Sequence, residues 1–249
     1  MSKITPIFRS SIFFSFHMRT EFNVQESIIN YLVLHSMDSP NEVGLFRGQM
    51  GYVIALSKYA RQHNIPQLET IADFICDNVF SRAGALRDIS FATGLSGICW
   101  GIEYLVQEGI LDGYAEAYCS DVDADIMKID VSRVSDFSLE SGLGGLWLYV
   151  RARLQGNHIA NLKAPFDNEY LEKWIWIIES NPAAFPPNSK QMLTDCLSGS
   201  MKPIKISVGP FIEDFSDIPT RNLSLVNGIA GYMLKHLNNG YAHSFCRRE

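Results

Sequence analysis

Residues 88–97, with the sequence DISFATGLSG, carry the pattern that decides the fold of this chain. Two glycines three positions apart stand just ahead of an apolar stretch, and the pattern recurs at residues 44–51 (GLFRGQMG), 136–145 (DFSLESGLGG) and 222–231 (NLSLVNGIAG). The first glycines of the four pairs, at positions 48, 94, 142 and 228, are separated by 46, 48 and 86 residues. Because the last gap is close to two periods, we expect that one copy has decayed.

A period of this length built from helices indicates stacked helical hairpins, since one hairpin cannot bury its own apolar face. The paired glycines are expected to lie on the first helical turn, where missing side chains let a neighbouring helix approach closely. The small polar residue just before each first glycine is expected to be the N-cap of the helix. The even spacing favours a single domain over residues 1–249.

Apolar positions three and four apart predict an all-α protein. Glycines 109, 156 and 240 are expected to end helices, and the decayed repeat is expected after residue 156. The predicted helices cover residues 25–35, 49–61, 66–80, 95–107, 115–126, 143–154, 170–178, 190–197 and 229–237, and an extended crossing segment is predicted within 201–219.

Composition narrows the classes of partner. A formal net charge of −6 and a pI near 5.5 argue against nucleic acid and anionic membranes, which need clustered Lys and Arg. No run reaches the roughly 20 apolar residues of a membrane span, and residues 12–16 are too short for a signal-peptide core. Five scattered cysteines indicate free thiols and a cytoplasmic location rather than a disulfide framework.

The repeated motif resembles that of the lanthionine synthetase C-like family, whose helical hairpins close into an α/α toroid and whose inner helices open with Gly-x-x-Gly. The likeness covers most of the chain and is carried best by residues 90–98 (SFATGLSGI) and 224–232 (SLVNGIAGY). It implies an α/α toroid of repeated helical hairpins. Six hairpins of about 45 residues would need roughly 270 residues, so we expect a shortened or incomplete ring.

The resemblance also implies a role in peptide modification. The family's cyclases join a cysteine thiol to a dehydrated Ser or Thr of a precursor peptide, and zinc converts the thiol to a thiolate. The family's zinc ligands stand in Trp-Cys-Tyr-Gly and Cys-His-Gly segments, which are absent here: Cys196 precedes Leu197 and Cys119 precedes Ser120. The family's catalytic acid and histidine also have no counterpart. We therefore expect no metal site and no cofactor, with zinc on other ligands as the alternative.

Three carboxylates are the candidate catalytic groups. Asp88, Asp136 and Glu140 lie just ahead of motif glycines, where paired carboxylates could act as acid and base. Acidic residues are also expected at helix starts because the helix dipole favours negative charge there.

The residues immediately before the first glycines are the candidate ligand-binding groups. Arg47 replaces a small polar residue, so its guanidinium is a candidate for holding a carboxylate or phosphate of a ligand. Thr93, Ser141 and Asn227 are candidates for touching a bound peptide, with helix capping as the alternative. His243 and Cys246 have a metal-ligand spacing but lack a second pair. The tryptophans 100, 147, 174 and 176 are expected to pack in the core and grooves.

These observations lead to one main hypothesis and two alternatives. The main one is a lanthionine synthetase C-like protein in peptide modification, either a divergent cyclase or a zinc-free pseudoenzyme that binds a precursor peptide or a modification-enzyme partner. The second is a carbohydrate-active α/α barrel that uses Asp88, Asp136 or Glu140. The third is a non-catalytic interaction scaffold. Whether the protein is an enzyme stays open at this point.

Overall fold

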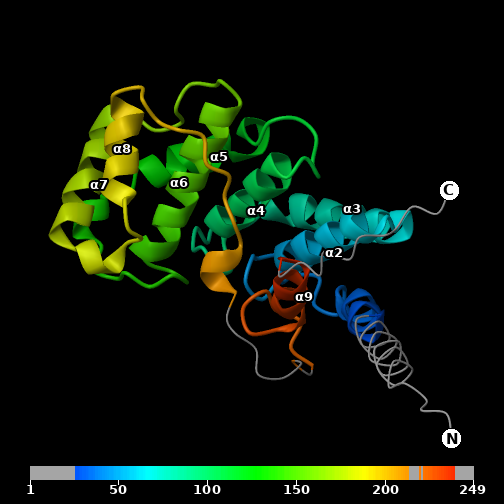
Figure 1. Ribbon diagram of the computed structural model, residues 1–249. Coiled ribbons are helices and arrows are strands. Elements are labelled where there is room, and N and C mark those ends of the chain that lie inside the picture. Colours follow the sequence, from blue (N-terminus) through cyan, green and yellow to red (C-terminus); the bar gives the residue numbers. More distant parts are fainter. Residues whose placement is uncertain (1–25, 213–218, 220, 239–249) are drawn as a thin grey trace, which may run out of the picture.

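The computed structural model describes residues 26–212, 219 and 221–238, and the regular secondary structure of these residues is entirely helical (Figure 1). This confirms the all-α prediction. Residues 12–16, Gly240, His243 and Cys246 lie outside the described residues. Within the described part, no helix combines the length and the apolar character that crossing a bilayer requires.

The helices follow the predicted order closely. The helix predicted over residues 170–178 is two residues longer at each end, whereas the helix predicted over residues 95–107 has these bounds in the structure. A helix over residues 26–35 precedes α2 (Gln49–His63), α3 (Pro66–Ala83), α4 (Leu95–Gln107), α5 (Glu116–Met127), α6 (Leu143–Ile159), α7 (Asn168–Ser180), α8 (Ser189–Leu197) and α9 (Ile229–Asn238), with short 3-10 turns at η1 (Val131–Arg133), η2 (Pro182–Ala184) and η3 (Gly209–Phe211).

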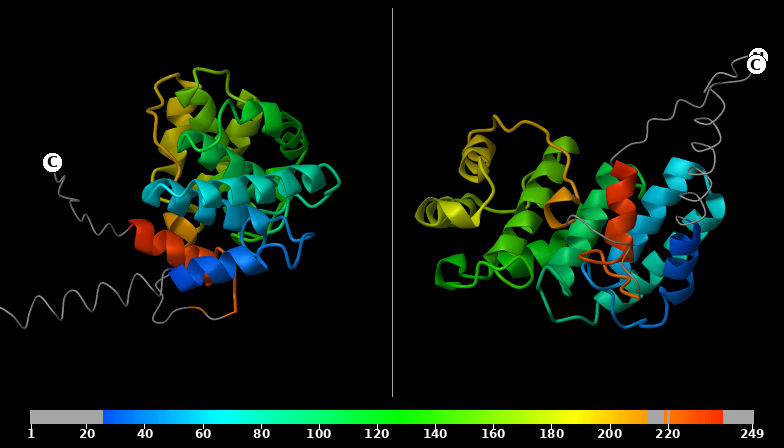
Figure 2. Two further views of the ribbon diagram at one scale, coloured as in Figure 1. Left: turned by 90° about the vertical axis from the view of Figure 1, so that its right-hand side faces the viewer. Right: turned by 60° about the horizontal axis from the view of Figure 1, so that its bottom comes forward.

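Four helices, α2, α4, α6 and α9, each begin at a motif copy, and we call them the motif helices. They pack side by side in the order α9, α2, α4, α6. The last motif helix in the sequence therefore lies beside the first, as Figure 2 shows for α9 (red) next to the blue helices. Helices α3 and α5 pack against α2 and α4, and α7 and α8 form a pair where the decayed repeat was expected.

Each motif loop folds back over the first turn of its own helix. The amide of the residue after the first glycine donates to the carbonyl seven positions earlier, at 2.8–2.9 Å, in all four copies. In the second copy this bond joins Leu95 N to Asp88 O, and a Cβ on Gly94 would lie 2.5 Å from the same oxygen. The first glycine therefore lets the loop close against the helix start.

The second glycine of each pair makes a different close approach. A Cβ on Gly97 would lie 1.9 Å from the Phe91 carbonyl of its own loop and 3.0 Å from Leu45 Cβ of the neighbouring copy. A Cβ on Gly145 would likewise meet Phe91 Cβ of the second copy, at 2.4 Å. The prediction that the pair admits a neighbouring helix was thus wrong, because a loop fills that space. Direct contact between motif helices occurs one turn later, where Met50 of α2 packs on Gly101 of α4.

The predicted N-caps Thr93 and Ser141 were also wrong. The N-caps are the glycines themselves: Gly48, Gly94 and Gly142 have extended backbones and give no side-chain cap. Thr93 and Ser141 donate instead to carboxylates of their own loops. The small polar residue thus stabilises the loop rather than the helix end.

Gly156 does not end its helix, contrary to the prediction. Helix α6 continues to Ile159, and a Cβ on Gly156 would lie 1.8 Å from Glu103 Oε1 of α4. The glycine makes room for a buried carboxylate. Gly109, by contrast, follows Glu108, the C-cap of α4, and has φ of +66°, as expected for a residue that ends a helix.

The core is one continuous cluster between the motif helices and their partners. Trp100, Trp147 and Trp174 are buried as expected, but Trp176 is 58% exposed because it lies on the outer face of α7. Cys76, Cys99 and Cys119 are buried free thiols, and Cys196 is partly buried and free. The four described cysteines therefore form no disulfide with one another.

Candidate functional site

The four motif loops form a hydrogen-bonded row at one end of the motif helices. Leu225 N donates to Phe46 O at 2.7 Å, Phe46 N to Ala92 O at 2.9 Å, and Ala92 N to Glu140 O at 2.9 Å. Adjacent copies are thus joined backbone to backbone. Most of the residues predicted to be functional lie in this row.

Asp88 and Asp136 perform the same structural task in two loops. Asp136 accepts hydrogen bonds from Ser138 N (2.8 Å), Ser138 Oγ (2.9 Å) and Ser141 Oγ (3.0 Å). These bonds lower the pKa of Asp136, the backbone bond from Ser138 first. Burial would raise the pKa of Asp88, but hydrogen bonds from Ser90 and Thr93 outweigh it and lower that pKa. Both carboxylates are therefore held ionised as acceptors within their own loops.

The other predicted groups are dispersed. Glu140 is exposed and contributes its backbone carbonyl to the row. Arg47 is exposed, and within the described residues its guanidinium makes no ion pair. Asn227 is exposed with φ of +58°, and its carbonyl accepts from Asn222 Nδ2 at 3.0 Å. The structure thus brings Asp88 together with Thr93 and Asp136 together with Ser141, and leaves Arg47 apart.

We expect Asp136→Ala to lower the melting temperature, because three hydrogen-bond donors of the loop lose their acceptor. The lowered pKa of Asp136 gives the sign of the pH dependence: its contribution is present above the ordinary Asp value of 3.8 and is lost as the pH falls below it. Thermal unfolding at pH 7 and pH 3 tests this, with Asp121→Ala on the exposed face of α5 as the matched control. An Asp136 penalty that persists unchanged at pH 3 would contradict the loop-holding role.

A hollow of about 340 Å³ lies between the second and third loops. Asp88, Ser90 and Ser141 line its polar end, and apolar side chains such as Ile129 and Leu146 line the rest. The hydroxyl of Ser96 faces this region fully buried, without a hydrogen-bond partner in the described part of the chain. Predicted catalytic and ligand-binding residues of different loops, Asp88 and Ser141, thus border a common space.

Metal ligands are not gathered in the described part of the chain, where no three His, Cys, Asp or Glu side chains form a metal-binding group. Cys196 and His158 border a hollow of about 170 Å³ beside α6. Burial raises the pKa of the Cys196 thiol, which favours its protonated form.

A buried charge cluster joins α4, α5 and α6, and sequence reasoning missed it. The guanidinium of Arg153 is fully buried and binds Asp123 (2.7 and 3.0 Å) and Glu103 (2.9 Å). The half-exposed carboxylate of Glu116 also accepts from it. Burial raises the pKa of Glu103 even though Gln107 and Arg153 donate to it. The only sequence signal was a charged residue within the apolar stretch of each motif helix.

Residues 201–208, which we call the crossing segment, pass over α6 and α4 without regular secondary structure (Figure 1), and Val208 at its end already has the helical backbone of the η3 N-cap. Ile204 N donates to Gln155 Oε1 of α6 at 2.8 Å, and Ile206 N donates to Gln107 Oε1 of α4 at 3.0 Å. The side chains of Ile206 and Val208 are buried. The predicted extended segment is confirmed for residues 201–207, where two glutamines hold its backbone, but not for residues 209–211, which form η3.

The orientation of the Gln107 side-chain amide is fixed by its contact with the buried charge cluster. Its Nε2 donates to Glu103 Oε1 at 2.9 Å, and Glu103 is in turn bound by Arg153. The amide oxygen of Gln107 must therefore face the crossing segment as an acceptor. The buried charge cluster thus determines that Gln107 offers a hydrogen-bond acceptor, rather than a donor, to the crossing segment.

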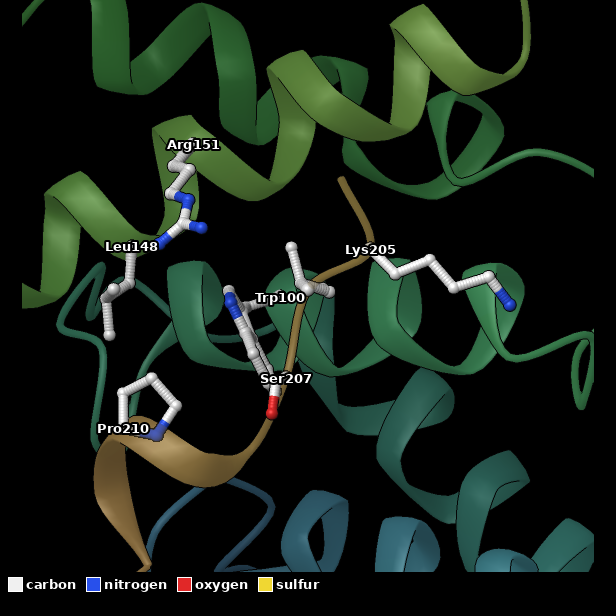
Figure 3. Close-up of a pocket in the computed structure, with 7 residues that line it drawn as sticks. Trp100, Leu148, Arg151, Lys205, Ser207 and Pro210 are labelled. Atoms are coloured by element: carbon white, nitrogen blue, oxygen red, sulfur yellow. The ribbon is translucent and has the colours of Figure 1, made fainter. Parts of the chain in front are cut away.

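A small hollow of about 80 Å³ lies between the crossing segment and the motif helices (Figure 3). Trp100 of α4 and Leu148 and Arg151 of α6 form its floor, and the segment closes it from above with Lys205 and Ser207. Figure 3 shows the Arg151 guanidinium between Leu148 and Trp100, whereas the Lys205 ammonium points away.

Comparisons of this chain with family models, with curated proteins and with solved structures find no match. The function is therefore argued from the geometry described above.

Proposed function

We propose that this chain is a lanthionine synthetase C-like repeat protein that binds an extended polypeptide across α4 and α6 without zinc-dependent cyclisation. The observation that carries this proposal is the crossing segment, which is an extended polypeptide held by its backbone on that surface. A precursor peptide of a modification pathway is the kind of ligand that such a surface suits.

Gln155 and Gln107 bind the backbone of the crossing segment rather than its side chains. The amides of Ile204 and Ile206 are two residues apart and so point to the same side of an extended chain. Gln155 and Gln107 accept one each, from two neighbouring helices. Any extended peptide offers the same alternate N–H groups, so the surface can bind chains of differing sequence.

The row of motif helices supports the toroid part of the proposal. In the order α9, α2, α4, α6 the C-terminal copy lies beside the N-terminal copy, as a ring requires. In this proposal, α7, α8 and the crossing segment replace the missing repeat between α6 and α9.

Peptide binding can be tested with a random decapeptide library displayed on phage and selected on the full-length protein. Selected peptides are then titrated by fluorescence polarisation against full-length Ile206→Pro, in which the crossing segment no longer competes fully for the glutamines, and against the same variant with Gln107→Ala/Gln155→Ala. Loss of two hydrogen bonds of about 1 kcal/mol each predicts roughly 30-fold weaker binding. Gln191→Ala is the matched control, since Gln191 lies exposed on α8 and pairs only within its own helix.

Two outcomes would count against the proposal. Failure to enrich any peptide would remove its basis, and equal affinity for the double variant would place the binding surface elsewhere. Metal analysis of protein purified without a metal-affinity tag tests the zinc-free part: one zinc per chain, lost in Cys196→Ala, would instead favour the cyclase hypothesis.

A further inference from the structure

Two polar groups next to the crossing segment are left without partners by it. Gln155 is 1% exposed, and its Nε2 makes no hydrogen bond within the described residues, although its Oε1 is used. A buried amide N–H without an acceptor destabilises the folded protein, because it has lost its hydrogen bonds to water without replacing them. The crossing segment thus provides a hydrogen-bond partner for the oxygen of the Gln155 amide but not for its nitrogen.

Arg151 is the second such group. Its side chain is half-buried in the hollow, and its guanidinium has neither an ion pair nor a hydrogen bond among the described residues. None of the residues that line the hollow carries a carboxylate, and the segment brings a second cation, Lys205. Burial lowers the pKa of Arg151, and no group among the described residues compensates its charge.

We propose that the crossing segment is a displaceable internal occupant of this surface, and that the ligand is an extended peptide with an acidic side chain opposite Arg151. This inference rests on the proposed function and adds the class of peptide. A carboxylate in the hollow would neutralise Arg151 by a charge-assisted pair, and a backbone carbonyl of the ligand would accept from Gln155 Nε2. The chain's own segment does neither.

A pair of isomeric peptides tests the charge preference. Both copy residues 200–210 with a fluorescein label; one carries Lys205→Glu, next to the hollow, and the other Lys202→Glu, which is exposed and does not line it. Their net charges are equal. The protein is full-length Ile206→Pro, which removes one backbone donor and a buried side chain and so loosens the internal segment; circular dichroism checks that it keeps its helices.

We expect the Lys205→Glu peptide to bind about five- to tenfold more tightly than the Lys202→Glu peptide. The preference should vanish in Ile206→Pro/Arg151→Gln. Equal binding of both peptides to Ile206→Pro would overturn the acidic-ligand inference and leave the proposed function standing. Binding of neither peptide would contradict the proposed function as well.

A second measurement does not depend on the Ile206→Pro variant, because the crossing segment stays in place. In the full-length protein, Lys205→Glu should melt about 2–4 °C above Lys202→Glu, because a glutamate side chain that turns toward the hollow, which residue 205 lines, brings a carboxylate to Arg151. The difference should disappear when both are combined with Arg151→Gln. Equal melting temperatures in the presence of Arg151 would refute the inference even if Ile206→Pro fails to fold.

Discussion

Arg153→Leu is expected to lower the free energy of unfolding at neutral pH by about 3–5 kcal/mol. The guanidinium is fully buried and is the only cation that contacts Asp123 and Glu103 among the described residues. Leucine fills part of the volume but leaves two buried carboxylates without a counter-charge. Urea denaturation at pH 7.5 measures the loss, and Arg133→Leu, which removes an exposed ion pair with Asp130, should change little.

The pH dependence of the Arg153 penalty distinguishes lost charge from lost packing. Glu103 has a raised pKa in the folded protein, so folding favours its protonated form, and its contribution is present at acid pH and lost as the pH rises through the raised pKa. Removing Arg153 raises this pKa further, because the guanidinium lowers it. The penalty should therefore be smaller at pH 5 than at pH 7.5, and an equal penalty at both would indicate packing alone.

The same cluster connects stability with the binding surface. Arg153 holds Glu103, Glu103 orients Gln107, and Gln107 accepts from the crossing segment. A variant that disturbs Glu103 should thus weaken the segment even where the helices survive. Peptide binding by Arg153 variants should accordingly be compared only with their folded fraction known.

The motif predicted the helices because its signal is local. Two glycines ahead of an apolar stretch mark where a helix begins, and α4 was placed correctly at both ends. What the glycines contact was not predictable, since Gly97 meets Leu45 from a copy about fifty positions away along the chain. The spacing of the motif glycines shows where a side chain is absent, but only the three-dimensional structure shows which atoms fill that space.

The candidate site was less accessible to sequence reasoning for a related reason. Asp88 and Asp136 stood out because they recur with the repeat, and the structure shows why: each closes its own loop. Gln155 stands 13 residues after Gly142, as Gln107 stands 13 residues after Gly94, so the two glutamines do recur with the repeat. Nothing in that spacing shows that a segment some fifty residues beyond Gln155 and Arg151 crosses above them. The repeat gives the position of such a residue but not the distant segment that it contacts.

Gly97→Ala tests the closest approach made at any of the motif glycines and is expected to be among the most damaging single-methyl changes in the described part of the chain. Its Cβ would lie 1.9 Å from the Phe91 carbonyl, which is backbone and cannot rotate away as a side chain can. The loop would have to move and would break the bonds from Phe91 N and Ala92 N to Glu140 O. Overpacking with lost hydrogen bonds predicts a loss of about 3 kcal/mol or more.

The matched control for Gly97→Ala is Gly84→Ala. Gly84 has an ordinary helical backbone, with φ of −60°, and no atom of the described residues lies within 4 Å of the place that an alanine Cβ would take. Alanine there should be neutral or stabilising by up to about 1 kcal/mol, because it restricts the unfolded chain. If chemical denaturation finds the two variants equally stable, the motif glycines are not closing the loops on their helices, and the repeat would need another physical explanation.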